Sequence, residues 1–357
     1  MSSSVFPDFD DQDDNFSTSD EELQRYLEQL RVKIRIFGAG GAGSNTINRL
    51  MKEGINGATM IACNTDAPHL LKTRASNKIL MGKNLTRGLG SGADPRIGEQ
   101  AARESDQEIM KFVSGTDISF ITAGLGGGTG TGSAHYIASR SRDSGALTIS
   151  VVTIPFSSEG KTRMQNAVWG LKKLISSSDT VIIIPNDKLL ELVPDLPLEK
   201  AFRFADEIIV KAITGISDLV TKPGLINLDF NDLRTIMRNS GLAMIGMGIS
   251  SGEPGIRVDE AVQKAIKSPF LDFDLSSATG VIINVTGGRD LQLEETNNAA
   301  EAVRKKVGRN TRIIWGATVD PKYDGNVEVL IVATGISSSN LPKFDNADSG
   351  SGIDFVA

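Results

Sequence analysis

The sequence feature that most constrains the fold is a glycine-rich run directly after an apolar strand. Residues 118–122 read Ile-Ser-Phe-Ile-Thr, and residues 123–134 read Ala-Gly-Leu-Gly-Gly-Gly-Thr-Gly-Thr-Gly-Ser-Ala. A strand, a glycine turn and a helix, here expected from Ser133 onward, aim backbone N–H groups at an anion. Glycine lets a phosphate approach those amides and permits positive φ. A flexible linker is the alternative, but linkers rarely lie between a strand and a helix. The run therefore predicts a phosphate cradle.

Composition limits the classes of protein that fit. With 357 residues and 39% hydrophobic content, the chain is long enough for two domains. No apolar run approaches the ~20 residues that cross a membrane, so we expect no direct membrane insertion. The single cysteine, Cys63, and the lack of a signal-peptide pattern favour a cytoplasmic protein. Only His69 and His135 are present, so we expect no structural zinc site and no histidine-based catalytic triad.

Charge is concentrated at the N-terminus. The chain carries a net charge of −6, and residues 1–30 hold nine acids against Arg25 alone, which leaves the remainder close to +2. No basic stripe follows, so we expect no nucleic-acid partner. Residues 1–20 have the composition of a disordered acidic arm. Residues 21–30 then fit a short amphipathic helix with Asp20 as its N-cap.

The first half alternates strands and helices, which predicts a doubly wound, mostly parallel α/β sheet. Ligands of such sheets bind at the carboxyl ends of the strands, where the glycine-rich turns 38–45, 88–92 and 126–132 would all lie. A single helix is expected over about 97–113. The expected strands are 32–37, 58–63, 78–81, 118–122, 146–153 and 180–184.

A long helix separates this region from a second one. Apolar residues spaced three and four apart predict one helix over 201–222, which Pro223-Gly224 ends. Four β-branched runs then predict an α+β domain with a four-stranded sheet. We therefore expect an arm at 1–20, a nucleotide domain with its N-terminal helix at 21–200, the central helix, an assembly and activation domain at 223–336, and a disordered tail at 337–357. The four runs are 242–248, 280–286, 311–318 and 327–334, with helices at 258–267 and 294–307.

The first glycine turn also fits a dinucleotide-binding fold. Gly38, Gly40 and Gly43 satisfy G-x-G-x-x-G, and Asp66 stands near the place of a ribose-binding acid. An NAD(P)-dependent oxidoreductase is therefore an alternative, although it would need a catalytic His, Lys or Tyr. Three glycine loops suit a nucleoside triphosphate better. A P-loop is excluded because Pro155 stands where that motif requires glycine.

Several motifs together resemble the tubulin superfamily. Residues 126–132 look like its glycine signature, and 38–45, 64–66, 88–95 and 227–232 follow in that superfamily's order. The resemblance covers about 32–337 and is closest to the FtsZ family of prokaryotic cell-division GTPases, of archaeal type. It implies a tubulin-like fold, GTP and GDP as ligands, and Mg²⁺ as cofactor. Ala42 and Ser44 stand where the family's first loop is commonly glycine, and both are small enough for binding to survive.

The resemblance implies which residues bind the nucleotide. Two glycine-rich loops would hold the phosphates, and Glu159 and Arg163 would contact the ribose and base side. Asn186 and Asp206 would read guanine, since a carboxylate can accept from the N1–H and 2-amino groups that adenine lacks. Without the family, Asp206 would be read as a solvated helix acid, and Glu159 with Arg163 as an exposed loop pair. The phosphate residues are Gly41, Ala42, Gly43, Ser44, Asn45, Gly126, Gly127, Gly128, Thr129, Gly130, Thr131 and Gly132.

Asp229 and Asp232 are the expected catalytic residues, although turn and N-cap chemistry would also account for them. Asp206 lies near the start of the long helix and Asp229 just past its end, at least ~20–25 Å away at 1.5 Å per residue. At this separation, Asp206 and Asp229 are not expected to serve the same nucleotide within one subunit. A head-to-tail contact would bring the acids of one subunit to the nucleotide of the next. They would orient the attacking water, with a bound cation as an option, while Mg²⁺ and the glycine amides neutralise the γ-phosphate.

The expected function is a GTPase that forms a division filament in the cytoplasm, near the membrane at the division site. A tubulin-like protein for cell shape or regulation, with weak hydrolysis, is the alternative, and the presence of both loop acids argues against it. The apolar cluster 353–356 would dock a membrane-attached adaptor, since the family tethers filaments through such tails; plain disorder is the other interpretation.

Overall fold

The computed structural model describes residues 31–55, 57–192, 197–222 and 229–336. The expected acidic arm, the helix expected at 21–30 and the tail with its cluster at 353–356 lie outside these residues. Within them, no helix is both long enough and apolar enough to cross a bilayer.

One ten-stranded sheet organises the described part of the chain, in the order β3-β2-β1-β4-β5-β6-β7-β10-β8-β9. All pairs from β3 to β7 are parallel, β10 is antiparallel to both β7 and β8, and β9 is parallel to β8. The predicted doubly wound, mostly parallel sheet is confirmed. The strands are β1 (Ile34–Ala39), β2 (Ala58–Asn64), β3 (Asn77–Leu80), β4 (Ile118–Gly124), β5 (Leu147–Ile154), β6 (Thr180–Pro185), β7 (Gly241–Ser250), β8 (Gly280–Gly287), β9 (Arg312–Val319) and β10 (Val327–Ile336).

Helices cover both faces of the sheet. One apolar core contains side chains of α2, α10 and α11, and the other contains side chains of α5 to α8, α12 and α13. Because both faces are covered, central strands such as β5 are buried along their whole length. The helices are α2 (Gly40–Glu53), α3 (Ala67–Lys72), α4 (Lys83–Thr86), α5 (Pro95–Glu104), α6 (Asp106–Val113), α7 (Thr129–Asp143), α8 (Lys161–Ser177), α9 (Asp187–Leu192), α10 (Leu198–Thr221), α11 (Phe230–Met237), α12 (Arg257–Ile266) and α13 (Leu293–Arg304), with 3₁₀ turns η1 (Ser157–Glu159), η2 (Pro269–Leu271), η3 (Leu275–Ser277) and η4 (Pro321–Tyr323).

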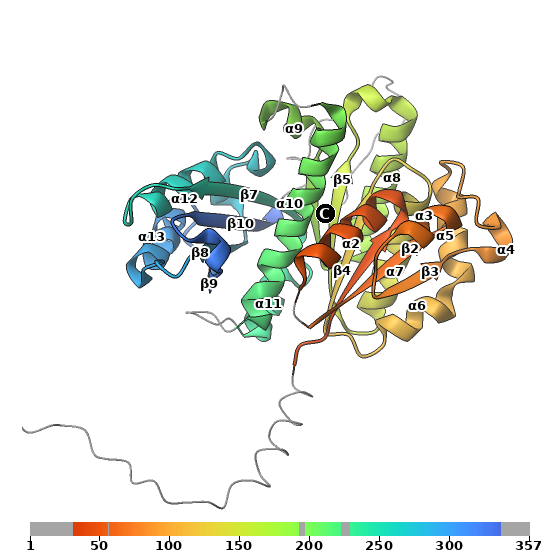
Figure 1. The fold of residues 1–357 in the computed structure, drawn as a ribbon, viewed down its shortest axis with the longest axis horizontal. Helices are drawn as coiled ribbons and strands as arrows, with labels where there is room; N and C mark the ends of the chain where they lie inside the picture. Colours follow the sequence, from red (N-terminus) through yellow and green to blue (C-terminus); the bar gives the residue numbers. More distant parts are fainter. Residues whose placement is uncertain (1–30, 56, 193–196, 223–228, 337–357) are drawn as a thin grey trace, which may run out of the picture.

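Helix α10 runs between the two halves of the molecule. It has 24 residues, which makes it about 36 Å long. Figure 1 shows α9 at one end of α10 and α11 at the other. The predicted four-stranded sheet is present as β7-β10-β8-β9, and it is joined to the first six strands by the pairing of Thr180–Ile182 with residues 241–243. The chain therefore has one continuous sheet with α10 packed across it.

Two helix boundaries differ from the predicted ones. Helix α7 begins at Thr129 instead of Ser133, so the last glycines of the run form its first turns. The helix expected over 97–113 is two helices, α5 and α6, which meet at Ser105. The Ser105 hydroxyl accepts a hydrogen bond of 3.1 Å from Gly82 N, and this long-range contact fixes the break. Tertiary packing, which helical periodicity does not report, sets both boundaries.

Candidate nucleotide site

A pocket of about 490 Å³ lies at the carboxyl ends of β4, β5 and β6, where the glycine-rich loops meet. Its walls come from α2, the loop before α5, the start of α7, the turn η1 and the first half of α10. The lining residues are Gly41, Ala42, Asn45, Ser91, Gly92, Ala93, Gly124, Leu125, Gly127, Gly128, Thr129, Gly130, Thr153, Pro155, Glu159, Arg163, Asn186, Phe202, Ala205 and Asp206.

Two helix N-termini form the floor of this pocket. Helices α2 and α7 have 14 and 15 residues, and both begin at residues of the glycine turns. Their first-turn N–H groups have no partner within the helix and carry the positive end of its dipole. A Cβ on Gly40 would lie 2.6 Å from Gly130 N, so the two turns approach backbone to backbone. This arrangement suits a chain of phosphates.

Hydroxyl groups tie the loops together around Thr129. Its Oγ1 lies 2.7 Å from Thr65 Oγ1 and 3.0 Å from Ser91 Oγ. Thr65 and Ser91 were not among the predicted site residues. Their motifs are the available signal, because 64–66 lies at the end of strand β2 and 88–95 is a glycine-rich loop that leads from α4 to α5.

Five predicted phosphate residues do not line the pocket: Gly43, Ser44, Gly126, Thr131 and Gly132. Their positions are structural. A Cβ on Gly132 would lie 2.0 Å from Pro95 O, so this glycine permits α7 to pack on α5. Gly126 has φ of 106°, and its N–H donates to Thr131 Oγ1 at 2.9 Å. Such residues support the conformation of the glycine loop without lining the pocket.

The base side of the pocket holds two acceptor groups. Asn186 is 5% exposed, and its Oδ1 has no hydrogen-bond partner among the described residues. Burial raises the pKa of Asp206 to about 6, against the opposing effect of Arg49 and a 3.5 Å hydrogen bond from Thr46 Oγ1. A buried acceptor without a partner, such as Asn186 Oδ1, is costly unless a ligand supplies a donor, and half-buried Asp206 has only one weak hydrogen bond. The two side chains therefore fit a base edge that donates hydrogen bonds.

Glu159 and Arg163 lie at the mouth of the pocket. The Arg163 guanidinium forms an ion pair with the Glu159 carboxylate, one helical turn away. Glu159 Oε1 also accepts from Phe156 N at 2.9 Å, which fixes the carboxylate on the turn η1. Because Glu159 is held in place, its ion pair with Arg163 fixes the position of the guanidinium at the pocket.

Helix α11 lies at the other end of α10 (Figure 1), and Asp229 and Asp232 belong to its N-cap and first turn. Asp229 is the N-cap of α11, because its Oδ1 accepts from Asn231 N at 3.2 Å. Asp232 lies in the first turn and is exposed. Among the described residues, no hydrogen bond or ion pair occupies the Asp232 carboxylate. Neither acid lines the nucleotide pocket of its own subunit.

Asp66, the acid that a dinucleotide fold would use for ribose, has a local role. It is the N-cap of α3, and its Oδ1 accepts from His69 N at 2.9 Å. A metal site made from side chains alone is also missing: the described part of the chain contains no group of three His, Cys, Asp or Glu residues that could hold an ion.

Comparisons with known proteins agree with this geometry. Residues 33–194 match the model of the Tubulin/FtsZ family, GTPase domain, and residues 241–337 match that of the FtsZ family, C-terminal domain. The chain is 52% identical to "Cell division protein FtsZ 1" of Pyrococcus furiosus, over 90% of this chain and 86% of that protein. It is 50% identical to the protein of the same name from Archaeoglobus fulgidus, over 96% of this chain and 93% of that one.

A solved structure, the empty FtsZ dimer of Methanocaldococcus jannaschii, matches with a TM-score of 0.86. It is 52% identical and covers 90% of this chain and 93% of that chain. These matches exclude the oxidoreductase alternative, and Asp66 is accounted for as a helix cap. The chain therefore belongs to the Tubulin/FtsZ family, and its first half is a GTPase domain.

Proposed function

We propose that this protein is a GTP-dependent, filament-forming cell-division protein that hydrolyses GTP at the contact between head-to-tail subunits. Its division role is supported by the names of relatives that are about half identical over most of their length. Self-assembly is supported by the M. jannaschii FtsZ structure, which is of a dimer. The observation that carries the hydrolysis step is the length of α10, which separates the nucleotide pocket from Asp229 and Asp232.

In this proposal the pocket binds GTP and GDP. The first turns of α2 and α7 hold the phosphates with backbone N–H groups, and the hydroxyl of Thr129 adds a donor. Asp206 and Asn186 recognise guanine, because their oxygens can accept from N1–H and the 2-amino group. Glu159 and Arg163 contact the sugar side.

Catalysis is completed by the next subunit. A heterologous contact that does not close a ring generates a filament and repeats one junction at every subunit. Placed over the γ-phosphate of a neighbour, Asp232 and Asp229 orient and polarise the attacking water, while the glycine-loop amides stabilise charge on the phosphate. The exposed carboxylate of Asp232, which has no partner among the described residues, is available for this, whereas Asp229 also caps its helix.

Mg²⁺ is the proposed cofactor, and its bound charge would offset that of the phosphates. Since the described residues offer no three-ligand cluster, the ion would be held chiefly by phosphate oxygens and water. The hydroxyls of Thr129, Ser91 and Thr65, which contact one another beside the glycine loop, are neutral oxygens that could complete the ion's coordination.

Turnover per subunit against protein concentration tests the proposal. An active site built from two subunits predicts a threshold, with almost no turnover in dilute monomer and a steep rise as sedimentable polymer forms. A rate per subunit that is constant from dilute monomer upward would contradict it. Parallel runs with GTP, GDP and ATP test the guanine preference.

Asp232→Ala supplies the matching variant. It should bind GTP as the wild type does and lose turnover by about 10²-fold or more. Asp259→Ala is the control, because Asp259 is likewise an exposed acid in the first turn of a helix, α12. Equal losses in the two variants would exclude a specific role for Asp232.

We also propose that residues 353–356 bind a membrane-attached adaptor and so place the filament in the cytoplasm at the division site. The support is the isolated apolar composition of this segment after a polar stretch. Removing residues 353–357 should leave turnover and sedimentation unchanged and disperse the protein from the division site. Retained localisation of the shortened chain would refute the adaptor role.

A further inference from the structure

The connection from α11 to β7 is fixed by one residue with an unusual backbone conformation. Arg238, Asn239 and Ser240 form this connection. Asn239 has φ of 54°, in the left-handed region that asparagine tolerates better than most residues. Because the chain turns here directly after the helix, the contacts of Asn239 help to fix the end of α11.

Two buried residues at the start of β6 hold this connection. Thr180 Oγ1 donates to Met237 O at 2.5 Å and lies 2.8 Å from Ser240 Oγ. Asp179 Oδ1 accepts from Asn239 N at 3.4 Å. These contacts attach the last turn of α11 to the central sheet.

Arg142, in helix α7, supplies a further contact to this connection. Its Nη2 donates to Asn239 Oδ1 at 2.7 Å, and its Nη1 donates to Ser176 O at 3.0 Å. Its Nε lies 3.8 Å from Asp179 Oδ1. Arg142 is in the last turn of α7, and Ser176 is in the last turn of α8. One guanidinium therefore joins the ends of two helices to the end of a third.

Both of those helices begin at the nucleotide pocket. Helix α7 has 15 residues and starts at Thr129, which lines the pocket. Helix α8 has 17 residues and carries the pocket residue Arg163 in its first turn. At 1.5 Å per residue each helix spans about 22–26 Å. They form two stiff connections from the phosphate end of the molecule to the exit of α11.

We infer that Arg142 is a positioning residue for GTP hydrolysis: through Asn239 it fixes α11 and, with it, the acids Asp229 and Asp232 that serve the next subunit. The inference rests on the proposed function. Helix α11 has only eight residues, and besides the contacts of Thr180 and Asp179 at its C-terminal end it is held by an apolar face that packs without directional bonds. Without the hydrogen bond from Arg142 to Asn239, Thr180 still holds the last turn of the helix, and the helix can shift about that contact along its apolar face.

Arg142→Ala should therefore lower turnover per sedimented subunit about 10- to 100-fold, because displacement of about 1 Å at a reacting group has effects of this size. GTP affinity should stay within twofold, since Arg142 does not line the pocket. Arg142 lies in an open hollow of about 340 Å³. Guanidinium at millimolar concentration should enter it and restore part of the turnover, which would not happen after general destabilisation.

Two further variants separate the hydrogen bond from charge and folding effects. Asn239→Gly keeps the left-handed backbone and removes the acceptor, so it should reproduce the loss. The double variant that combines Asn239→Gly with Arg142→Ala should turn over GTP no more slowly than the less active of the two single variants, because both substitutions remove the same hydrogen bond. Arg238→Ala removes a positive charge from the same hollow and should keep turnover. Unchanged turnover in both Arg142→Ala and Asn239→Gly, or an equal loss in Arg238→Ala, would overturn the inference.

Mixed filaments distinguish this inference from the proposed function. Asp206→Asn subunits, with a damaged pocket and an intact α11, are mixed with Arg142→Ala or with Asp232→Ala subunits. Each mixture creates junctions with one intact pocket facing one intact α11, so turnover should exceed the mean of the separate proteins. Recovery with Asp232→Ala alone would overturn the role of Arg142 only. No recovery in either mixture would overturn the proposed shared site and the inference together.

Discussion

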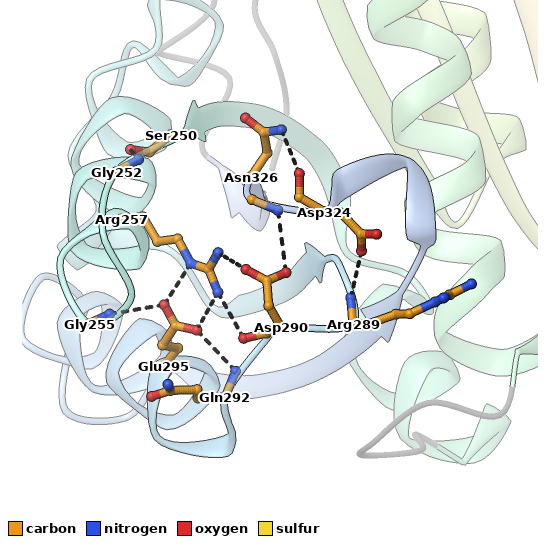
Figure 2. A network of polar contacts seen from close by, with 11 residues as sticks. Ser250, Gly252, Gly255, Arg257, Arg289, Asp290, Gln292, Glu295, Asp324 and Asn326 are labelled. Carbon is orange, nitrogen blue, oxygen red and sulfur yellow. Dashed lines mark hydrogen bonds and ion pairs between the residues drawn. The ribbon is translucent and has the colours of Figure 1, made fainter.

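Arg257 and Glu295 form a two-point ion pair inside the second half of the molecule, with both side chains 1% exposed. Arg257 Nε donates to Glu295 Oε1 at 2.8 Å, and Nη2 donates to Oε2 at 2.9 Å (Figure 2). The same guanidinium binds the carboxylate of Asp290, and Glu295 accepts from Gly255 N and Gln292 N. The pair therefore fixes the loops before α12 and α13, and each buried charge has several partners.

Glu295→Ala should lower the free energy of unfolding by about 3–5 kcal/mol, because it leaves a buried guanidinium short of its partner. Burial would raise the pKa of Glu295, but the hydrogen bond from Arg257 holds it below its usual value. The pair consequently stabilises the fold above the ordinary pKa of a glutamate and loses this effect as the pH falls. Denaturant unfolding of the wild type and of Glu295→Ala at neutral and acidic pH measures both the loss of stability and its dependence on pH.

Glu294→Ala is the control for that variant. Glu294 is adjacent in the same first turn of α13 and exposed, so its loss should change stability by at most about 0.5 kcal/mol. If the two variants unfolded at the same denaturant concentration, the buried pair would not be the source of the stability.

Gly132→Ala should destabilise the protein through packing. The added Cβ would lie 2.0 Å from Pro95 O and 2.6 Å from Glu99 N, so α5 and α7 must separate. Overpacking of this kind costs about 1–3 kcal/mol. Thermal unfolding of the nucleotide-free protein should show the loss, and weaker GTP binding should accompany it.

Gly127→Ala, in the same glycine run, should leave stability unchanged and affect GTP binding alone. No atom lies within 4 Å of a Cβ built there, and Gly127 lines the pocket. The variant should unfold at the wild-type temperature and bind GTP less tightly, because its methyl group enters the space for phosphate. A stability loss equal to that of Gly132→Ala would show that the two positions were assigned incorrectly.

Much of the fold could be predicted because most of its strands have a recognisable sequence pattern. Buried parallel strands such as β5 are continuous β-branched runs, and the glycine turns mark where they end. The long helix was predictable from its apolar spacing. The split between α5 and α6 was not, because the Ser105–Gly82 hydrogen bond joins residues 23 positions apart.

The site was predictable at the level of loops more than of side chains. The sequence motif could not separate Gly132, which packs against α5, from Gly127, which lines the pocket, because both are glycines of one run. Ser91 and Thr65 lie in recognised motifs, but only the folded chain places their hydroxyls beside Thr129. Arg142 carries no motif at all, since its partner Asn239 is 97 residues away.

Mg²⁺ should bind only together with the nucleotide. The described residues hold no cluster of three acidic, histidine or cysteine ligands, and in the proposed site the phosphates would supply much of the coordination. Calorimetry should detect no Mg²⁺ binding to nucleotide-free protein and saturable binding to its GTP complex. Removal of Mg²⁺ with EDTA should abolish turnover and leave weaker GTP binding. One-to-one binding of Mg²⁺ to the nucleotide-free protein would contradict this.

The affinity for GTP should depend on pH through Asp206. Burial raises the pKa of this carboxyl to about 6. The unliganded protein therefore loses stability as the pH rises from about 4 to 6, because the unfolded chain releases this proton near pH 4 and the folded protein only near pH 6. In the proposed site guanine donates to the carboxylate, so binding should favour the charged form. Affinity should therefore be constant above about pH 7 and fall toward tenfold per unit well below pH 6. Titrations with the wild type and with Asp206→Asn separate this effect from protonation of the nucleotide itself, which both proteins share. The variant should bind GTP weakly with only the shallow pH dependence of the nucleotide, and the same steep profile in both proteins would exclude Asp206 as the titrating group.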